Sequence, residues 1–192
     1  MRAESCHDAR VELVPVVLAA LSLLPRPPGG TETSRRVAVE AMVTAATEKP
    51  LFARDPGGDG SAEIAATALL LAAVAQHESS FNPRVGDCTI RGGGAISYFQ
   101  LLGEFSLGGH TRAEICASPL LAAQLALRVL HLQRSRCKGC APSDWLAGYA
   151  SGAPRRPSRT SRETLKVLEQ LAKNAHLSVP TRVPGSPRWE HP

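Results

Sequence analysis

The stretch SAEIAATALLLAAVAQHESSFNP, from Ser61 to Pro83, joins a long apolar segment to a short polar one. Its apolar residues recur at helical spacing, and Glu78 lies four residues beyond Val74 on the same stripe. Pro83 disfavours helical geometry at the residue before it, so the helix is predicted to end near Phe81. The stretch therefore predicts a carboxyl group on the core-facing side of the last turn of a buried helix.

The rest of the chain is also predicted to be mainly α, because Ala, Leu and Val dominate it and β-branched alternation is scarce. Apolar runs and start signals predict five more helices. Two lie before the quoted stretch: one over residues 13–24, and one that is capped by Thr33 or Ser34 and runs to about Thr47. Three lie after it: one from Ser118 and Pro119 to around Cys137, one from Pro142 to a stop at Gly152, and one whose Thr160 and Glu163 have capping-box spacing. Loops are expected over residues 50–60, and a Gly-rich loop or short β-hairpin over residues 91–97.

The composition fits one globular domain with short appendages, since 192 residues and 43% hydrophobic content allow a core but not two ordinary domains. The formal charge of +5 favours anionic partners without identifying them. Aromatic residues make up only 4%, and no basic run is interleaved with them, so nucleic acid is not the expected partner. A DNA-binding role for the basic segment 155–162 is the alternative that this charge leaves open.

The apolar run at residues 13–24 is shorter than the roughly 20 residues that a membrane span requires, so no span is expected. Glu4, Asp8 and Glu12 precede it and Pro15 interrupts it, whereas a secretory signal has a positively charged start. A buried helix of the fold is therefore favoured over a cleaved signal.

The five cysteines form an odd set, of which Cys137 and Cys140 have a spacing that suits a metal or a redox pair. A structural zinc site needs a second pair, and Cys88 and Cys116 stand alone, so disulfides or buried thiols are favoured and no metal or other cofactor is expected. A disulfide among the cysteines expected near the cleft would brace its loops.

Glu78 has the environment that a general acid needs. The negative end of the helix dipole and partial loss of solvent both raise the pKa of a carboxyl group at this place. A protonated carboxyl group near neutral pH can donate to the oxygen of a glycosidic bond. On spacing alone, a solvated glutamate at a helix end remains the simpler interpretation.

The neighbouring residues favour the catalytic interpretation. The string AQHESSFNP at 75–83 resembles the catalytic-helix motif of the soluble lytic transglycosylase family in the lysozyme superfamily, an apolar helix ending in Glu-Ser and then an aromatic residue and Asn-Pro. ISYFQLL at 96–102 is similar to the family's cleft-lining Gly-Leu-x-Gln-Leu/Ile segment, and WLAGYASG at 145–152 is similar to its Tyr-Asn-x-Gly motif. The three occur in the family's order, over a little under half of the chain.

The resemblance implies a role for individual residues. Glu78 would be the catalytic acid and base, and Ser79 would support it. Gln100 and Ser97 would line the cleft, although Ser97 and Tyr98 replace the usual small residues. Tyr149 would hydrogen-bond Glu78 or the substrate, and Ala150 stands where the family has Asn. His77 is expected on another face of the helix, as a surface or structural residue.

The resemblance also implies a fold and an activity. It predicts a lysozyme-like catalytic core at residues 61–153. The helix signals and the composition outside this core predict N-terminal helices and a linker at 1–60 that pack on it, a basic connector and C-terminal helix at 154–178 and a disordered Pro-rich tail at 179–192. The activity would be that of a peptidoglycan lytic transglycosylase, which cleaves the β-1,4 bond between N-acetylmuramic acid (MurNAc) and N-acetylglucosamine (GlcNAc) with one glutamate. No second carboxylate is needed when the 2-acetamido group of the substrate stabilises the developing cation.

Two alternatives stay open at this point. A hydrolytic muramidase would use a second acid, for which Asp87 is the nearest candidate, and a non-catalytic cell-wall-binding protein would keep only the fold. The expected partner is the peptidoglycan glycan strand, met by a monomer at the bacterial cell wall or periplasm. Without a convincing signal peptide, either a phage lysin or virion-associated enzyme or a bacterial protein with a non-standard export route fits.

Overall fold

The computed structural model describes residues 3–25, 28–52, 59–90, 95–137, 140–151 and 157–177. Within these ranges the regular structure is helical, apart from one isolated antiparallel bridge between Ile96 and Leu101. The helices are α1 (Ala3–Ser22), α2 (Glu32–Glu48), α3 (Ser61–Ser79), α4 (Pro83–Gly86), α5 (Gly103–Leu107), α6 (Arg112–Ala117), α7 (Pro119–Arg136), α8 (Pro142–Ser151) and α9 (Arg159–Asn174). The prediction of a mainly α chain is confirmed.

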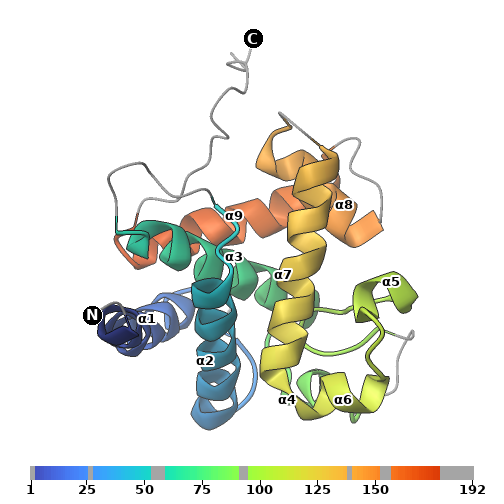
Figure 1. The fold of residues 1–192 in the computed structure, drawn as a ribbon, viewed down its shortest axis with the longest axis horizontal. Helices are drawn as coiled ribbons and strands as arrows, with labels where there is room; N and C mark the ends of the chain where they lie inside the picture. The colour runs from blue at the N-terminus through green and yellow to red at the C-terminus, as the bar shows by residue number, and fades with distance from the viewer. Residues whose placement is uncertain are drawn as a thin grey trace.

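Helix α3 lies in the middle of the molecule, where α1, α2, α7 and α9 pack around it. Figure 1 shows it running across the molecule behind α2 and α7. Residues 65–76 are all buried, so the predicted single core-facing stripe is too narrow a description of this helix. The many alanines let neighbouring helices approach from several sides, and a helix that is apolar all round is buried all round. The last turn of α3 emerges from this packing at Glu78.

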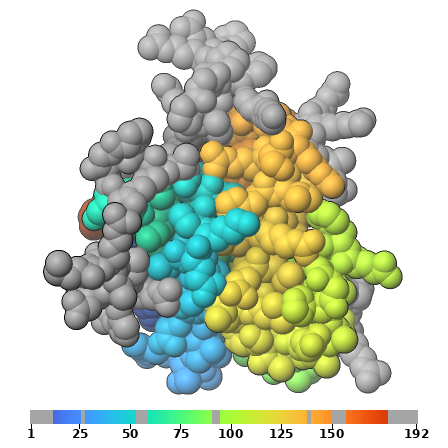
Figure 2. All heavy atoms as spheres, viewed as in Figure 1, coloured from blue at the N-terminus to red at the C-terminus, as the bar shows by residue number. Residues whose placement is uncertain are grey.

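Helix α7 forms the second long support of the fold. Its start is as predicted, because the Ser118 side chain accepts a hydrogen bond from the Leu121 N–H and Pro119 occupies the first turn. It ends at Arg136 with Cys137 as the C-cap, again as predicted. The space-filling view shows α7 in yellow between α2 in blue and α6 in yellow-green (Figure 2).

Two predicted helix caps are wrong by a few residues. Thr31, not Thr33 or Ser34, caps α2, and its side chain accepts from the Ser34 N–H. The capping box of α9 joins Ser158 to Ser161, whereas the Glu163 carboxylate receives the Arg159 Nε–H at 2.7 Å. In both places several Ser and Thr residues with the same capping chemistry lie close together, and the tertiary path of the chain selects among them.

The apolar run at residues 13–24 falls in the second half of α1 and just beyond it, and Pro15 is inside the helix rather than at its boundary. Val17, Ala20 and Leu21 are buried in the common core, so the expected packing role is confirmed. Among the described residues, no helix is both long and apolar enough to cross a membrane.

Several sequence predictions concern residues outside the described ranges. They are the loop around Asp55, the glycines of 91–94, the helix stop at Gly152, the start of the basic connector at 154–156 and the tail at 179–192. Of the predicted hairpin, the structure describes only the tight turn from Ile96 to Leu101 that the isolated bridge closes.

Candidate active site

The chain turns sharply immediately after Glu78. Ser80 ends α3 in the left-handed region at φ 50°, with its N–H donating to the Gln76 carbonyl, and Phe81 follows at φ 54°. Phe81 is 1% exposed, and Asn82 caps α4 by accepting from the Arg84 N–H. The residues after Glu78 thus have structural tasks that keep the end of α3 in one place.

A segment far away in the sequence holds the same turn. The Gly29 N–H donates to the Ser80 carbonyl at 2.6 Å, which ties the linker between α1 and α2 to the exit of α3. A Cβ at Gly29 would lie 3.0 Å from that oxygen, closer than most side chains tolerate. The approach therefore suits glycine.

The three motif segments contact one another. The ring centres of Phe81 and Tyr98 lie 5.9 Å apart, and this aromatic contact joins the first segment to the second. The Tyr149 hydroxyl donates to the Phe99 carbonyl at 2.8 Å, which joins the second segment to the third. Gly86 makes room for Tyr98, since a Cβ there would come within 2.2 Å of the Tyr98 ring. Segments that are far apart in the sequence thus form one continuous cluster.

A groove of about 770 Å³ lies against this cluster. Its lining residues fall into two sets. One comes from the motif segments and includes Glu78, Gln100 and Tyr149, and we call it the motif side. The other comes from α5 and α7, and we call it the α7 side; its members include Phe105, Ser106, Val129, Gln133 and Arg136. Three of the five residues that sequence reasoning placed in the site are therefore brought together on one groove.

Burial is the main cause of the raised pKa of Glu78, because loss of water disfavours the charged carboxylate. The positive charge of a protonated His77 acts in the opposite direction and lowers this pKa. The pKa of Tyr149 lies well above its ordinary value, first because the phenol is desolvated and then because Glu78 is nearby. The groove thus holds a carboxyl group that keeps its proton to a higher pH than a solvated glutamate.

His77 reaches the same groove as Glu78 and also borders a second hollow of about 430 Å³ near α1 and α9. Because α3 ends within one turn of both residues, the groove at its end extends to His77 as well as to Glu78. His77 is therefore part of the electrostatic environment of Glu78.

Tyr149 differs from its prediction in its hydrogen bond, since its hydroxyl proton goes to the Phe99 carbonyl and not to Glu78. The consequence is structural: the phenol fixes the turn that carries Gln100. The Gln100 side chain is held as well, with Nε2 donating to the Ser97 carbonyl at 3.0 Å.

The remaining candidates do not line the groove. The Ser79 hydroxyl donates to the Ala75 carbonyl of its own helix. Ser97 is buried, and its hydroxyl oxygen accepts from the Phe99 N–H within the tight turn. Asp87 is exposed and accepts from the Thr89 N–H. Ser79 and Ser97 therefore act on local backbone, and Asp87 belongs to a turn outside the groove.

Sequence reasoning missed Phe105, Gln133 and Arg136. A signal for the α7 residues was present, because Val129, Gln133 and Arg136 follow one another at steps of four and three residues on one helix face. This face becomes recognisable as part of a groove only when α5 is seen to pack beside it.

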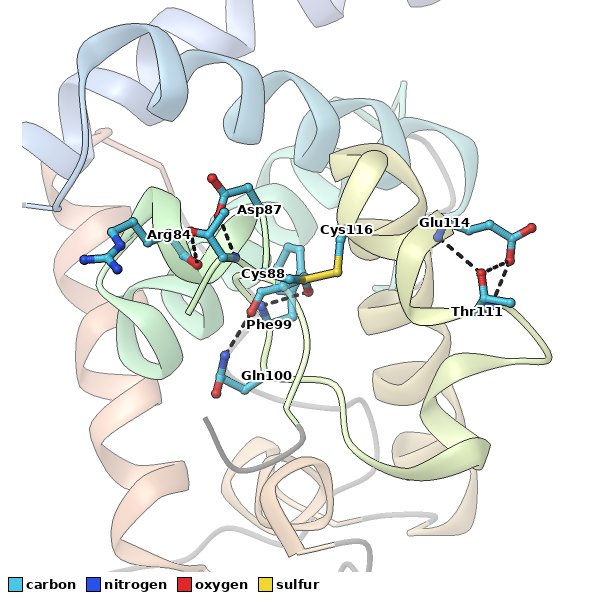
Figure 3. Close-up of a disulfide and its surroundings, with 10 residues drawn as sticks. Arg84, Asp87, Cys88, Phe99, Gln100, Thr111, Glu114 and Cys116 are labelled. Atoms are coloured by element: carbon cyan, nitrogen blue, oxygen red, sulfur yellow. Dashed lines mark hydrogen bonds between the residues drawn. A yellow bond between two sulfur atoms is a disulfide. The ribbon is translucent and has the colours of Figure 1, made fainter. Parts of the chain in front are cut away.

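Two disulfides form among the described cysteines, Cys88 with Cys116 and Cys137 with Cys140. The first joins the loop after α4 to α6, and Figure 3 shows it drawn next to the turn with Phe99 and Gln100. Since α6 leads directly into α7, this disulfide ties the loop after α4 to the start of the helix that carries the α7 side. No group of three or more potential metal ligands occurs among the described residues.

Comparison with known proteins gave no match: no family model, no curated protein and no solved structure is similar to this chain at a significant level.

Proposed function

We propose that this chain is a lysozyme-like peptidoglycan lytic transglycosylase that cleaves the β-1,4 bond between MurNAc and GlcNAc. The observation that carries the proposal is the Glu78 carboxyl group, which lies in a groove with its pKa raised by burial. A carboxyl group that keeps its proton to a higher pH than a solvated glutamate and that opens onto a groove has the properties of a glycosidic general acid.

The arrangement of the motifs supports the same proposal. The segments that resemble the soluble lytic transglycosylase motifs are joined through Phe81, Tyr98, Phe99 and Tyr149, and each segment contributes at least two of the residues that line the groove. A chance resemblance would not require three separate segments to meet around the glutamate.

The acids at the groove favour a single-glutamate mechanism. Among the described residues that line it, Glu78 is the only carboxylic acid, and Asp87 lies elsewhere. In the proposed step, Glu78 donates its proton to the glycosidic oxygen as the C1–O bond breaks, and the substrate's 2-acetamido group stabilises the cation. The Glu78 carboxylate then takes the proton of the sugar's 6-hydroxyl, whose oxygen bonds to C1 and gives a 1,6-anhydro product. No water is consumed.

The test is digestion of purified peptidoglycan by wild type and by Glu78→Gln, with mass spectrometry of the products. We expect anhydro ends from the wild type and a loss of activity of about 10³-fold or more in the variant, because the amide cannot donate the proton. Glu169→Gln is the matched control, since it makes the same change at an exposed position of α9 and should leave activity unchanged.

The products also separate the alternatives. Reducing ends, each heavier by one water, would make the enzyme a hydrolase and overturn the transglycosylase step. Equal activity of wild type and Glu78→Gln, or no digestion by either, would overturn the catalytic proposal altogether and leave a cell-wall-binding role.

A further inference from the structure

The α7 side of the groove contains a buried polar group that no described residue pairs with. Gln133 is 2% exposed, and its Oε1 makes no hydrogen bond with any residue that the structure describes. Burying an amide oxygen in this way costs free energy, and such groups in folded proteins usually have a partner, in the protein or bound to it. Gln133 lines the groove, so a ligand there could satisfy an amide that the protein leaves unsatisfied.

Arg136 lies almost one turn further along the same face of α7 and also lines the groove. No described acid is within ion-pair distance of its guanidinium group. The guanidinium instead lies 5.1 Å from the centre of the Phe105 ring, where a cation–π contact holds it. Arg136 is therefore an oriented positive charge beside the groove, free to pair with an anion.

Phe105 adds an apolar surface to the same place. Its side chain is 46% exposed although it is large and hydrophobic, and neighbouring Leu102 is exposed as well. Both residues line the groove. An exposed aromatic ring at a groove is a suitable surface for the apolar face of a sugar.

We propose that Gln133, Arg136 and Phe105 form a subsite for a sugar that carries both an amide and a carboxylate, with Gln133 pairing with the amide and Arg136 with the carboxylate. This inference rests on the proposed function and deepens it, because it specifies which part of the glycan the α7 side recognises. The muramyl sugar has these groups: an acetamido group, and a lactyl ether that ends in a carboxylate or continues into an acidic peptide. A chitin-like polymer of GlcNAc has the amide but no carboxylate.

The test measures binding in the Glu78→Gln background, which removes turnover. Three soluble ligands are used: glycan strands with intact peptides, strands from which an amidase has removed the peptides to leave free lactyl carboxylates, and chitin oligosaccharides. Calorimetry measures the dissociation constant of each ligand for Glu78→Gln and for the double variant that also carries Arg136→Gln. Arg128→Gln is the matched control, because Arg128 also lies over the Phe105 ring, at 6.0 Å, but does not line the groove.

We expect Arg136→Gln to weaken binding of the carboxylate-bearing glycans about tenfold or more and to leave chitin oligosaccharides unchanged. A loss on the peptide-free strands identifies the lactyl carboxylate as the partner, and a loss on intact strands alone identifies the peptide. The proposal is overturned for Arg136 if binding of all three ligands weakens equally or if Arg128→Gln weakens binding in the same way.

Gln133→Leu tests the amide half of the subsite. We expect it to weaken binding of all three ligands, since each carries acetamido groups, while the melting temperature stays equal or rises because a buried unsatisfied oxygen is removed. Unchanged binding would overturn the assignment of Gln133. Failure of the subsite is distinct from failure of the proposed function. If the wild type digests peptidoglycan while the Arg136 and Gln133 variants show unchanged ligand binding, only the subsite is refuted.

Discussion

The two sides of the groove satisfy their polar groups in different ways. On the motif side, the Tyr149 hydroxyl and the Gln100 amide donate to backbone carbonyls of the tight turn at 96–101. On the α7 side, the Gln133 Oε1 has no partner within the described part of the chain, and no described acid pairs with Arg136. One side is thus fixed by the protein itself, whereas the other offers its hydrogen-bonding capacity to the groove.

This difference separates two tasks that a glycosidase has to perform. A proton donor works best when its surroundings are preorganised, because a small displacement costs much of the rate. A binding surface needs groups that gain a partner only when the ligand arrives. We therefore expect substitutions on the motif side to act on turnover and stability together, and substitutions on the α7 side to act on binding without loss of stability.

The Cys88–Cys116 disulfide, which joins the loop after α4 to α6, offers the largest test of this view after loss of Glu78. Cys88 and Cys116 are 28 residues apart and Cys137 and Cys140 only three, so closing the first loop restricts the unfolded chain more. Replacing Cys88 and Cys116 by Ala should lower the unfolding free energy by about 3.5 kcal/mol, against about 2 kcal/mol for the other pair.

Urea denaturation of both double variants measures the two losses. The Cys88/Cys116 variant should also lose activity under conditions where it is folded, because the loop after α4, whose Gly86 packs against the Tyr98 ring, is no longer tied to α6. Equal activity in the two double variants would show that the sides of the groove keep their relation without this link.

Tyr149→Phe tests the internal fixing of the motif side. The variant leaves the Phe99 carbonyl without its donor, and the unfolding free energy should fall by about 1 to 2 kcal/mol. The rate should fall too, since the turn that positions Gln100 is loosened. Tyr98→Phe is the control, because the Tyr98 hydroxyl makes no hydrogen bond among the described residues. Equal melting temperatures and equal turnover of Tyr149→Phe and Tyr98→Phe would show that Tyr149 does not preorganise the motif side.

The pH dependence gives the smallest effect and concerns the proton itself. Activity should fall as pH rises through the raised pKa of Glu78, because the acid form is lost. His77→Gln removes the positive charge that favours the ionised carboxylate, so this alkaline limb should move to higher pH. A pH–rate profile of both proteins measures the shift, and a move to lower pH would contradict the assigned sign.

The same pKa has a consequence for stability. Folding favours the protonated form of Glu78, so the folded state binds more protons than the unfolded state between the ordinary pKa of 4.5 and the raised one. Stability relative to Glu78→Gln should therefore fall as pH rises through this window. Matched denaturation curves of the two proteins across the window check the slope.

The sequence predicted those features that depend on neighbours along the chain. The start of α7 at Pro119 and the mainly α composition follow from periodicity, proline and caps, and α3 ends at Ser79, two residues before the predicted Phe81. The position of Glu78 in a groove followed from the motifs and not from the helix pattern alone.

Features that depend on tertiary packing escaped prediction. Gln133 and Arg136 look like ordinary polar residues of a helix until α5 lies beside them, and His77 changes its surroundings because α3 ends within a turn of it. Ser97 was assigned to the cleft by its place in a motif, whereas the tight turn directs its hydroxyl to the backbone. Each case concerns a side chain whose environment comes from a distant segment.

The hydrogen bond from Gly29 to Ser80 bears on how this protein could be shortened. A fragment that starts at Ser61 would contain every motif, yet it would lose this anchor together with the packing of α1 and α2 on α3. The helix that presents Glu78 would then expose an apolar flank and end in an untethered turn. Helices α1 and α2 and the linker residue Gly29 are thus part of the scaffold of the groove, and a minimal version of the protein has to retain them.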